Sequence, residues 1–244
     1  MRPTLALLIA ALGALAVIQP QAHAAGAGSL SDRAEVAGGG LAFPAVGEAL
    51  VPKVRARRKP RGGSERLATM PQFRFDHRPT VFYLLRSRRN QAGETWYRIS
   101  VPGRPNGRKG WVRSSQIRLR RSVGRLEIVI DRSALRLKLK RGAKKLLAAP
   151  VAVGTADAPT PLGRFYVTAR FRPGNPFLGP WAFETSAYAA ITDWPRGGIV
   201  GLHGTNLPSS VGTRASHGCL RVYNSVIRAL KRRVRPGTPI VIKR

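Results

Sequence analysis

The sequence has one cysteine, eleven acidic residues and no apolar run long enough to cross a bilayer. One cysteine excludes an intramolecular disulfide, and eleven acids with four histidines leave little material for carboxylate-rich metal cages. A membrane-spanning helix needs roughly 20 consecutive apolar residues. With 244 residues, 43% of them hydrophobic, the chain can form one large domain or two small ones around buried cores. Composition therefore predicts a folded protein and excludes wholesale disorder.

Acidic residues are so scarce that 43 Lys and Arg leave a formal net charge of +32. Such a charge concentrates polyanions around the chain and speeds encounter with them. Nucleic acid is the first partner to consider. However, the basic residues are scattered along the whole chain, without a helix-turn-helix, zinc-finger or RNA-recognition signature. We therefore expect anionic surroundings and no nucleic-acid partner.

The first 24 residues have the three parts of a secretory signal peptide. Arg2 precedes an apolar run at 5–18, and Ala22-His23-Ala24 provides small residues for cleavage after Ala24. The alternative is an uncleaved N-terminal anchor. Because no second apolar stretch follows, we expect an exported protein, in the cell wall, periplasm or medium, without a membrane span once the leader is removed.

Residues 25–69 contain few aromatic residues and many Ala, Gly and Arg. This composition predicts a flexible basic linker without a packed core. Such a tether could hold the protein against anionic cell-wall polymers.

Residues 70–121 show short strand patterns separated by turns, at 81–85, 96–101 and 110–113. Several short strands within about 50 residues are typical of a small all-β barrel. A Trp-Tyr strand followed by Gly-Trp-Val resembles a bacterial SH3-like domain. That resemblance implies binding to wall peptides or glycan, and a packing or spacer domain is the alternative.

From Gly124 onward the pattern predicts a second, mostly β domain. Leu135 to Lys140 alternate apolar and cationic residues with a period of two, as in a half-buried strand, and a hairpin turn follows at 141–144. Asn224 or Ser225 is expected to cap the one helix, which Pro236-Gly237 ends. Further strands are expected at 126–131, 146–153, 163–168, 197–202 and 239–242.

The chemistry-bearing residues lie in two short segments, His203-Gly204-Thr205 and Ser216-His217-Gly218-Cys219-Leu220-Arg221. A free thiol with a pKa of about 8.5 is mostly protonated at neutral pH, and its thiolate is the nucleophile. A nearby imidazole can remove the proton, and His203 and His217 are both candidates. The alternative is a buried, inert Cys219.

Residues near Cys219 and His203 are expected to have supporting roles. Arg214 and Arg221 would lower the pKa of the thiol, and Gly218 lets backbone amides approach a substrate carbonyl. No Asp or Glu follows Asp193, so a main-chain carbonyl such as that of Gly204 is the economical group to orient the base. For Ser216 and His217 we favour loop-shaping roles.

Two further alternatives concern tryptophan and metal. Trp181 and Trp194 could line a substrate cleft, although core packing is the more frequent use of Trp. Cys219, His203 and His217 are suitable zinc ligands by type, but their spacing lacks a usual zinc pattern. We therefore expect no metal and no cofactor.

The His-Gly and Ser-His-Gly-Cys-Leu-Arg segments, with Val151 to Gly154 and Pro159 to Phe165 upstream, resemble the L,D-transpeptidase catalytic-domain (YkuD-like) family over 124–243. The resemblance implies a β-sandwich-like fold. It also implies that Cys219 is the nucleophile, His203 the general base and acid, and Gly204 the carbonyl that orients the imidazole. Many members carry Asn where this chain has Arg221, which bears on donor or acceptor preference.

The implied activity is 3→3 cross-linking of peptidoglycan stem peptides through a Cys219 thioester, with inhibition by carbapenems. Backbone amides from His217 to Cys219, together with Ser216, Gly218 and Arg221, would surround the oxyanion and substrate. An L,D-carboxypeptidase or an enzyme that attaches proteins to the wall would use the same thioester. A non-catalytic cationic wall-binding protein is the alternative from another class.

Overall fold

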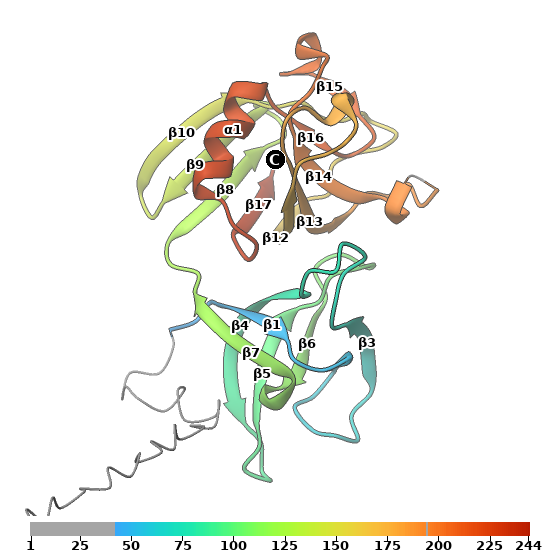
Figure 1. Cartoon of the computed structure of the whole chain (residues 1–244), viewed down its shortest axis with the longest axis vertical. Coiled ribbons are helices and arrows are strands. Elements are labelled where there is room, and N and C mark those ends of the chain that lie inside the picture. Colours follow the sequence, from blue (N-terminus) through green and yellow to red (C-terminus); the bar gives the residue numbers. More distant parts are fainter. Residues whose placement is uncertain (1–41, 194) are drawn as a thin grey trace, which may run out of the picture. The chain divides into compact units, whose positions relative to one another are not determined.

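β-strands are the main secondary structure of the computed structural model, which describes residues 42–193 and 195–244 and contains one α-helix among them (Figure 1). The predicted signal peptide at 1–24, the first part of the predicted linker at 25–41, and Trp194 lie outside the described residues. No helix among the described residues is long and apolar enough to span a membrane.

The N-terminal sheet is antiparallel throughout, in the order β3-β2-β6-β5-β4-β1-β7. Its core is aliphatic with one Phe and includes Val54, Phe82 and Ile99. The strands are β1 (Ala45–Ala49), β2 (Lys53–Arg57), β3 (Arg66–Pro71), β4 (Val81–Arg89), β5 (Thr95–Ser100), β6 (Lys109–Arg113) and β7 (Ile117–Ser122). The 3-10 turn η2 (Ser114–Gln116) precedes β7.

The prediction of a flexible linker is wrong for residues 42–69, because β1, β2 and most of β3 lie there. In β2 the buried Val54 and Ala56 alternate with the cationic residues Lys53 and Arg55. The high arginine content therefore reflects one solvated face of a strand, not disorder. The N-terminal module begins near Ala45, before the predicted boundary at residue 70.

The C-terminal part contains a mixed eight-stranded sheet in the order β10-β9-β8-β17-β12-β13-β14-β16. Its strands are β8 (Leu126–Asp131), β9 (Arg136–Arg141), β10 (Lys144–Pro150), β12 (Gly163–Phe171), β13 (Ala182–Tyr188), β14 (Ile199–His203), β16 (Leu220–Arg221) and β17 (Pro239–Lys243). A parallel pair, β11 (Val153–Gly154) with β15 (Arg214–Ser216), lies beside it. The remaining 3-10 turns are η3 (Pro176–Leu178), η4 (Pro195–Gly197) and η5 (Pro208–Ser210).

Strand β9 follows its sequence pattern directly. Leu137 and Leu139 are buried, while Arg136 and Lys138, which alternate with them, are exposed. Complete burial of a leucine side chain stabilises a fold by about 1.5–3 kcal/mol. Along the chain, β8 is the first strand of the eight-stranded sheet and β17 is the last. The two strands pair in parallel, so the beginning and the end of this part of the chain lie side by side.

The α-helix α1 (Asn224–Arg233) packs Ile227 and Leu230 into the core of the eight-stranded sheet (Figure 1). The predicted capping role of Asn224 or Ser225 is wrong, because the N-cap is Tyr223 and makes no side-chain cap. The Oδ1 atom of Asn224 instead accepts a hydrogen bond from the amide of Thr205 at 3.0 Å. That bond ties the helix to the segment after β14.

The two sheets contact each other within one compact unit. Tyr166 of β12 stacks on Tyr83 of β4 with 5.9 Å between ring centroids, and its hydroxyl donates to the carbonyl of Val81 at 3.2 Å. Asn106 exchanges two hydrogen bonds with the backbone of Tyr188, at 2.7 and 3.0 Å. These contacts hold the end of β13 against the N-terminal sheet.

Candidate active site

The thiol of Cys219 and the ring of His203 both lie beside Gly201. β14 and β16 run parallel and pair His203 with Arg221. The amide of Gly201 donates to Cys219 Sγ at 3.4 Å. A Cβ built on Gly201 would lie 3.5 Å from His203 Cδ2 and 3.8 Å from Sγ. The parallel pairing thus brings together two residues that are 16 positions apart in the chain.

His203 is buried, with 3% of its surface exposed, and its Nδ1 lies 2.5 Å from the carbonyl oxygen of Gly204. A carbonyl can only accept, so Nδ1 carries the hydrogen and Nε2 of the neutral ring is the acceptor. Burial lowers the pKa of His203 to about 4; the bond to Gly204 opposes that shift and the Arg221 charge adds to it. The imidazole is therefore uncharged at neutral pH and able to take a proton.

The thiol of Cys219 has a raised pKa, contrary to the expected lowering. Burial is the main cause and outweighs the Gly201 amide and the Arg221 guanidinium, which both lower the pKa. Arg214 is exposed and its side chain donates to the carbonyl of Arg132 at 3.2 Å. At rest the site therefore holds a protonated thiol beside a neutral imidazole, and a thiolate must form by proton transfer.

Hydrogen bonds fix the loop that carries the cysteine. Ser216 Oγ donates to the carbonyl of Cys219 at 2.6 Å and accepts from the amide of Gly218 at 3.2 Å. Thr160 Oγ1 donates to the carbonyl of Gly218 at 2.9 Å. The Gly218 amide is already bonded to Ser216, so this amide is engaged within the loop itself.

Gly218 is required for a reason that the sequence did not indicate. Its φ of +110° lies in the region that favours glycine. A Cβ at this position would lie 2.7 Å from Cβ of Ala189. The missing side chain therefore makes room for Ala189 of the protein itself, and not for a substrate.

Arg221 and Phe177 enclose the site on the side of η3. The Arg221 guanidinium lies 4.8 Å from the centroid of the Phe177 ring, and that ring lies 6.4 Å from the His203 ring. Arg221 is buried, and its Nε has no hydrogen-bond partner among the described residues. An aromatic residue 26 positions before His203 gave no signal in the sequence.

Two further residues are ones for which the sequence favours a structural role. His217 is exposed on the turn before Gly218. Trp181 packs against the core, with Arg172 and Lys231 over its ring at 5.4 and 4.6 Å, which agrees with a packing role. Among the residues that the structure describes, no group of three or more His, Cys, Asp or Glu could hold a metal ion.

Residues 125–242 match the family model described as the L,D-transpeptidase catalytic domain, YkuD. The candidate L,D-transpeptidases YkuD of Bacillus subtilis and of Bacillus licheniformis are 33% and 31% identical to this chain, over 48% and 47% of it. The chain spans 65% and 64% of those relatives. A solved L,D-transpeptidase from Mycobacterium smegmatis is 16% identical, with 62% of this chain and 91% of that chain covered and a TM-score of 0.42.

Proposed function

We propose that this chain, whose residues 125–242 match the L,D-transpeptidase catalytic domain, is a cysteine-dependent transpeptidase that forms 3→3 cross-links between peptidoglycan stem peptides. Cys219 is the nucleophile, His203 the general base and acid, and Gly204 the group that orients the imidazole. The observation that carries the proposal is the neutral His203 ring, held through Nδ1 by Gly204 and lying beside the Cys219 thiol.

In the first half-reaction the thiol proton passes to Nε2 of His203 while Sγ attacks the carbonyl carbon of the third stem residue. The tetrahedral oxyanion accepts hydrogen bonds from backbone amides of the cysteine loop. The bond between carbonyl carbon and nitrogen then breaks, and the imidazolium returns the proton to the leaving D-Ala amine. A thioester on Cys219 and free D-Ala result.

In the second half-reaction the side-chain amine of a neighbouring stem attacks the thioester carbonyl. His203 takes a proton from that amine, the bond between carbon and Sγ breaks, and the imidazolium protonates the departing thiolate. A new amide links two stem peptides and the site returns to its neutral pair. Positioned proton transfer of this kind typically contributes about 10²–10⁴-fold to a rate.

The raised pKa of Cys219 supports a mechanism in which the thiolate forms only as the bond to the carbonyl forms. Such a resting thiol limits reaction with other electrophiles.

We further propose that residues 1–24 direct export of the protein to the cell envelope. We also propose that the N-terminal module is SH3-like and contacts wall peptides, glycan or anionic wall polymers.

Incubation of the purified protein with disaccharide-tetrapeptide, followed by mass spectrometry, tests this proposal. We expect a cross-linked dimer with loss of one D-Ala for each bond formed. Accumulation of tripeptide alone would assign the L,D-carboxypeptidase, in which water attacks the same thioester. If His203→Gln and wild type both leave the tetrapeptide intact while the protein still binds wall material, the chain is a non-catalytic wall-binding protein.

A further inference from the structure

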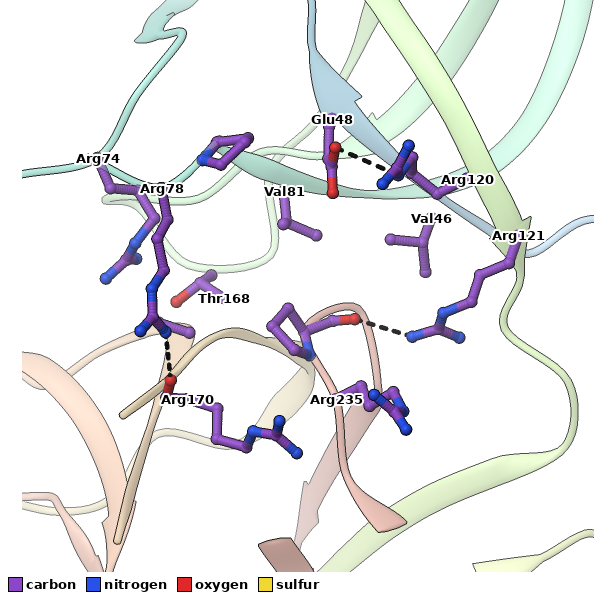
Figure 2. A pocket seen from close by; sticks show the side chains of 13 residues that line it. Val46, Glu48, Arg74, Arg78, Val81, Arg120, Arg121, Thr168, Arg170 and Arg235 are labelled. Atoms are coloured by element: carbon purple, nitrogen blue, oxygen red, sulfur yellow. Dashed lines mark hydrogen bonds and ion pairs between the residues drawn. The ribbon is translucent and has the colours of Figure 1, made fainter. Parts of the chain in front are cut away.

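A cavity that is separate from the cysteine site lies between the two sheets. Its volume is about 580 Å³, and Figure 2 shows residues of β1, β7 and the β3–β4 connection facing residues of β12 and the segment after α1. Ligand sites typically measure about 300–1,000 Å³. Neither His203 nor Cys219 lines this cavity.

The lining has a large excess of positive charge. One carboxylate, Glu48, faces six arginines: Arg74, Arg78, Arg120, Arg121, Arg170 and Arg235. Two of the six are neutralised. Arg120 pairs with Glu48 at 3.2 Å, and Arg74 pairs with Glu184 at 2.6 Å and with Asp76 at 3.2 Å.

The guanidinium groups of the other four arginines form no ion pair within 4.0 Å among the described residues; these are Arg78, Arg121, Arg170 and Arg235. Arg78 donates to the carbonyl of Arg170 at 2.8 Å, and Arg121 donates to that of Pro236 at 3.0 Å (Figure 2). Arg170 donates to the carbonyl of Lys231 at 2.9 Å. Carbonyl oxygens orient these guanidinium groups without forming ion pairs with them.

These charges repel one another across a partly buried space. The pKa of Arg121 is lowered by burial and by Arg235, and the pKa of Arg170 is lowered by burial, Arg235 and Arg78. An anion in the cavity would replace the repulsion with attraction. The four groups come from the β3–β4 connection, β7, β12 and the α1–β17 connection, so only the folded chain assembles them.

We propose that this cavity binds a compact phosphate-bearing anion, with Arg78, Arg121, Arg170 and Arg235 as its ligands. A guanidinium presents its N–H groups as a planar fork that matches phosphate oxygens two at a time. Four guanidinium groups without an ion pair in one small cavity match a ligand with two linked phosphate groups better than they match a single carboxylate. The site adds an anion-recognition function that does not depend on the cysteine chemistry.

Titration calorimetry of the full chain with inorganic pyrophosphate at fixed salt concentration tests the proposal. Arg78→Gln/Arg235→Gln is the informative variant, because both side chains are exposed and the fold does not depend on their burial. Arg136→Gln/Arg141→Gln, at the two exposed ends of β9, removes the same charge elsewhere. We expect one site per chain, weakened at least about tenfold in the first variant and less than about twofold in the control, since a charged hydrogen bond is lost at each position.

Equal weakening in both variants would attribute the binding to net charge and would overturn the proposal. No binding to wild type would also overturn it. Tighter binding of citrate than of pyrophosphate would overturn the phosphate assignment. The same proteins mixed with phosphatidylglycerol vesicles distinguish two sources of the ligand. Selective loss of vesicle binding in Arg78→Gln/Arg235→Gln supports the site with a lipid headgroup as its ligand, and selective loss with pyrophosphate alone supports it with a soluble phosphate compound.

Discussion

The low pKa of His203 predicts an unusual acid limit for the first half-reaction. Its value of about 4 lies well below the ordinary 6.5, mainly because the ring is buried. Acylation needs the neutral imidazole, so the rate should stay constant as pH falls to about 5 and then fall about tenfold per pH unit below 4.

The difference from an ordinary histidine is large enough to measure. At about pH 5.5 a group with a pKa of about 4 is about 97% neutral, and one with a pKa of 6.5 is about 9% neutral. The two cases differ roughly tenfold in acylation rate at that pH. The assay is the second-order rate of carbapenem acylation, followed by intact-protein mass between about pH 3.5 and 7.

A matched pair of variants identifies the group responsible. Arg221 lowers the pKa of His203 through its charge, so Arg221→Gln should move the acid limb to higher pH, while the exposed Arg136→Gln should leave it in place. A limb near 6.5 in wild type would refute the assignment of a buried, neutral base.

The remaining predictions concern stability and the loop around the cysteine. Gly218→Ala should lower the free energy of unfolding by about 1–3 kcal/mol, because the new side chain strains the backbone and contacts Ala189. Gly107→Ala, at φ +80° with open space around it, should lower it by less, and chemical denaturation compares the two variants. Glu184→Gln should cost about 3–5 kcal/mol, because its buried carboxylate pairs with two arginines, and an unchanged melting temperature would contradict this. Ser216→Ala should slow acylation and cost about 1–3 kcal/mol, whereas the exposed Ser209→Ala should do neither.

Protonation of His203 also links folding to pH. Since its pKa is lower in the folded protein than in the unfolded chain, the unfolded state binds the proton more readily between about pH 6.5 and 4. The contribution of His203 to the free energy of unfolding is fully present above about pH 6.5. It declines as pH falls from about 6.5 to 4, by about 3 kcal/mol in total.

Strand β9, with its alternating pattern, could be predicted from the sequence, whereas strand β13, which is buried on both faces, could not. Leu137 and Leu139 of β9 alternate with cations, so that strand was predicted. Every residue of β13 from Ala182 to Ala187 is buried, and its Glu184 is tolerated only because Arg74 and Arg196 pair with it. No local pattern reveals that arrangement, because the arginines come from distant segments.

The candidate site also combines residues that could be predicted from the sequence with residues that could not. His203, Gly204 and Cys219 stand in a recognisable motif, so their neighbourhood was expected from the sequence. Thr160 contacts Gly218 from 58 positions away, and its contribution depends on the fold. The direction of the Cys219 pKa shift also depends on the fold, because nearby cations suggest a lowered value while burial raises it.

The most direct test of the central claim is the intact mass of wild type and Cys219→Ala after incubation with a carbapenem. We expect wild type to gain the mass of one carbapenem and Cys219→Ala to gain none. An adduct of the same mass on Cys219→Ala would contradict the assignment of the thiol as the nucleophile.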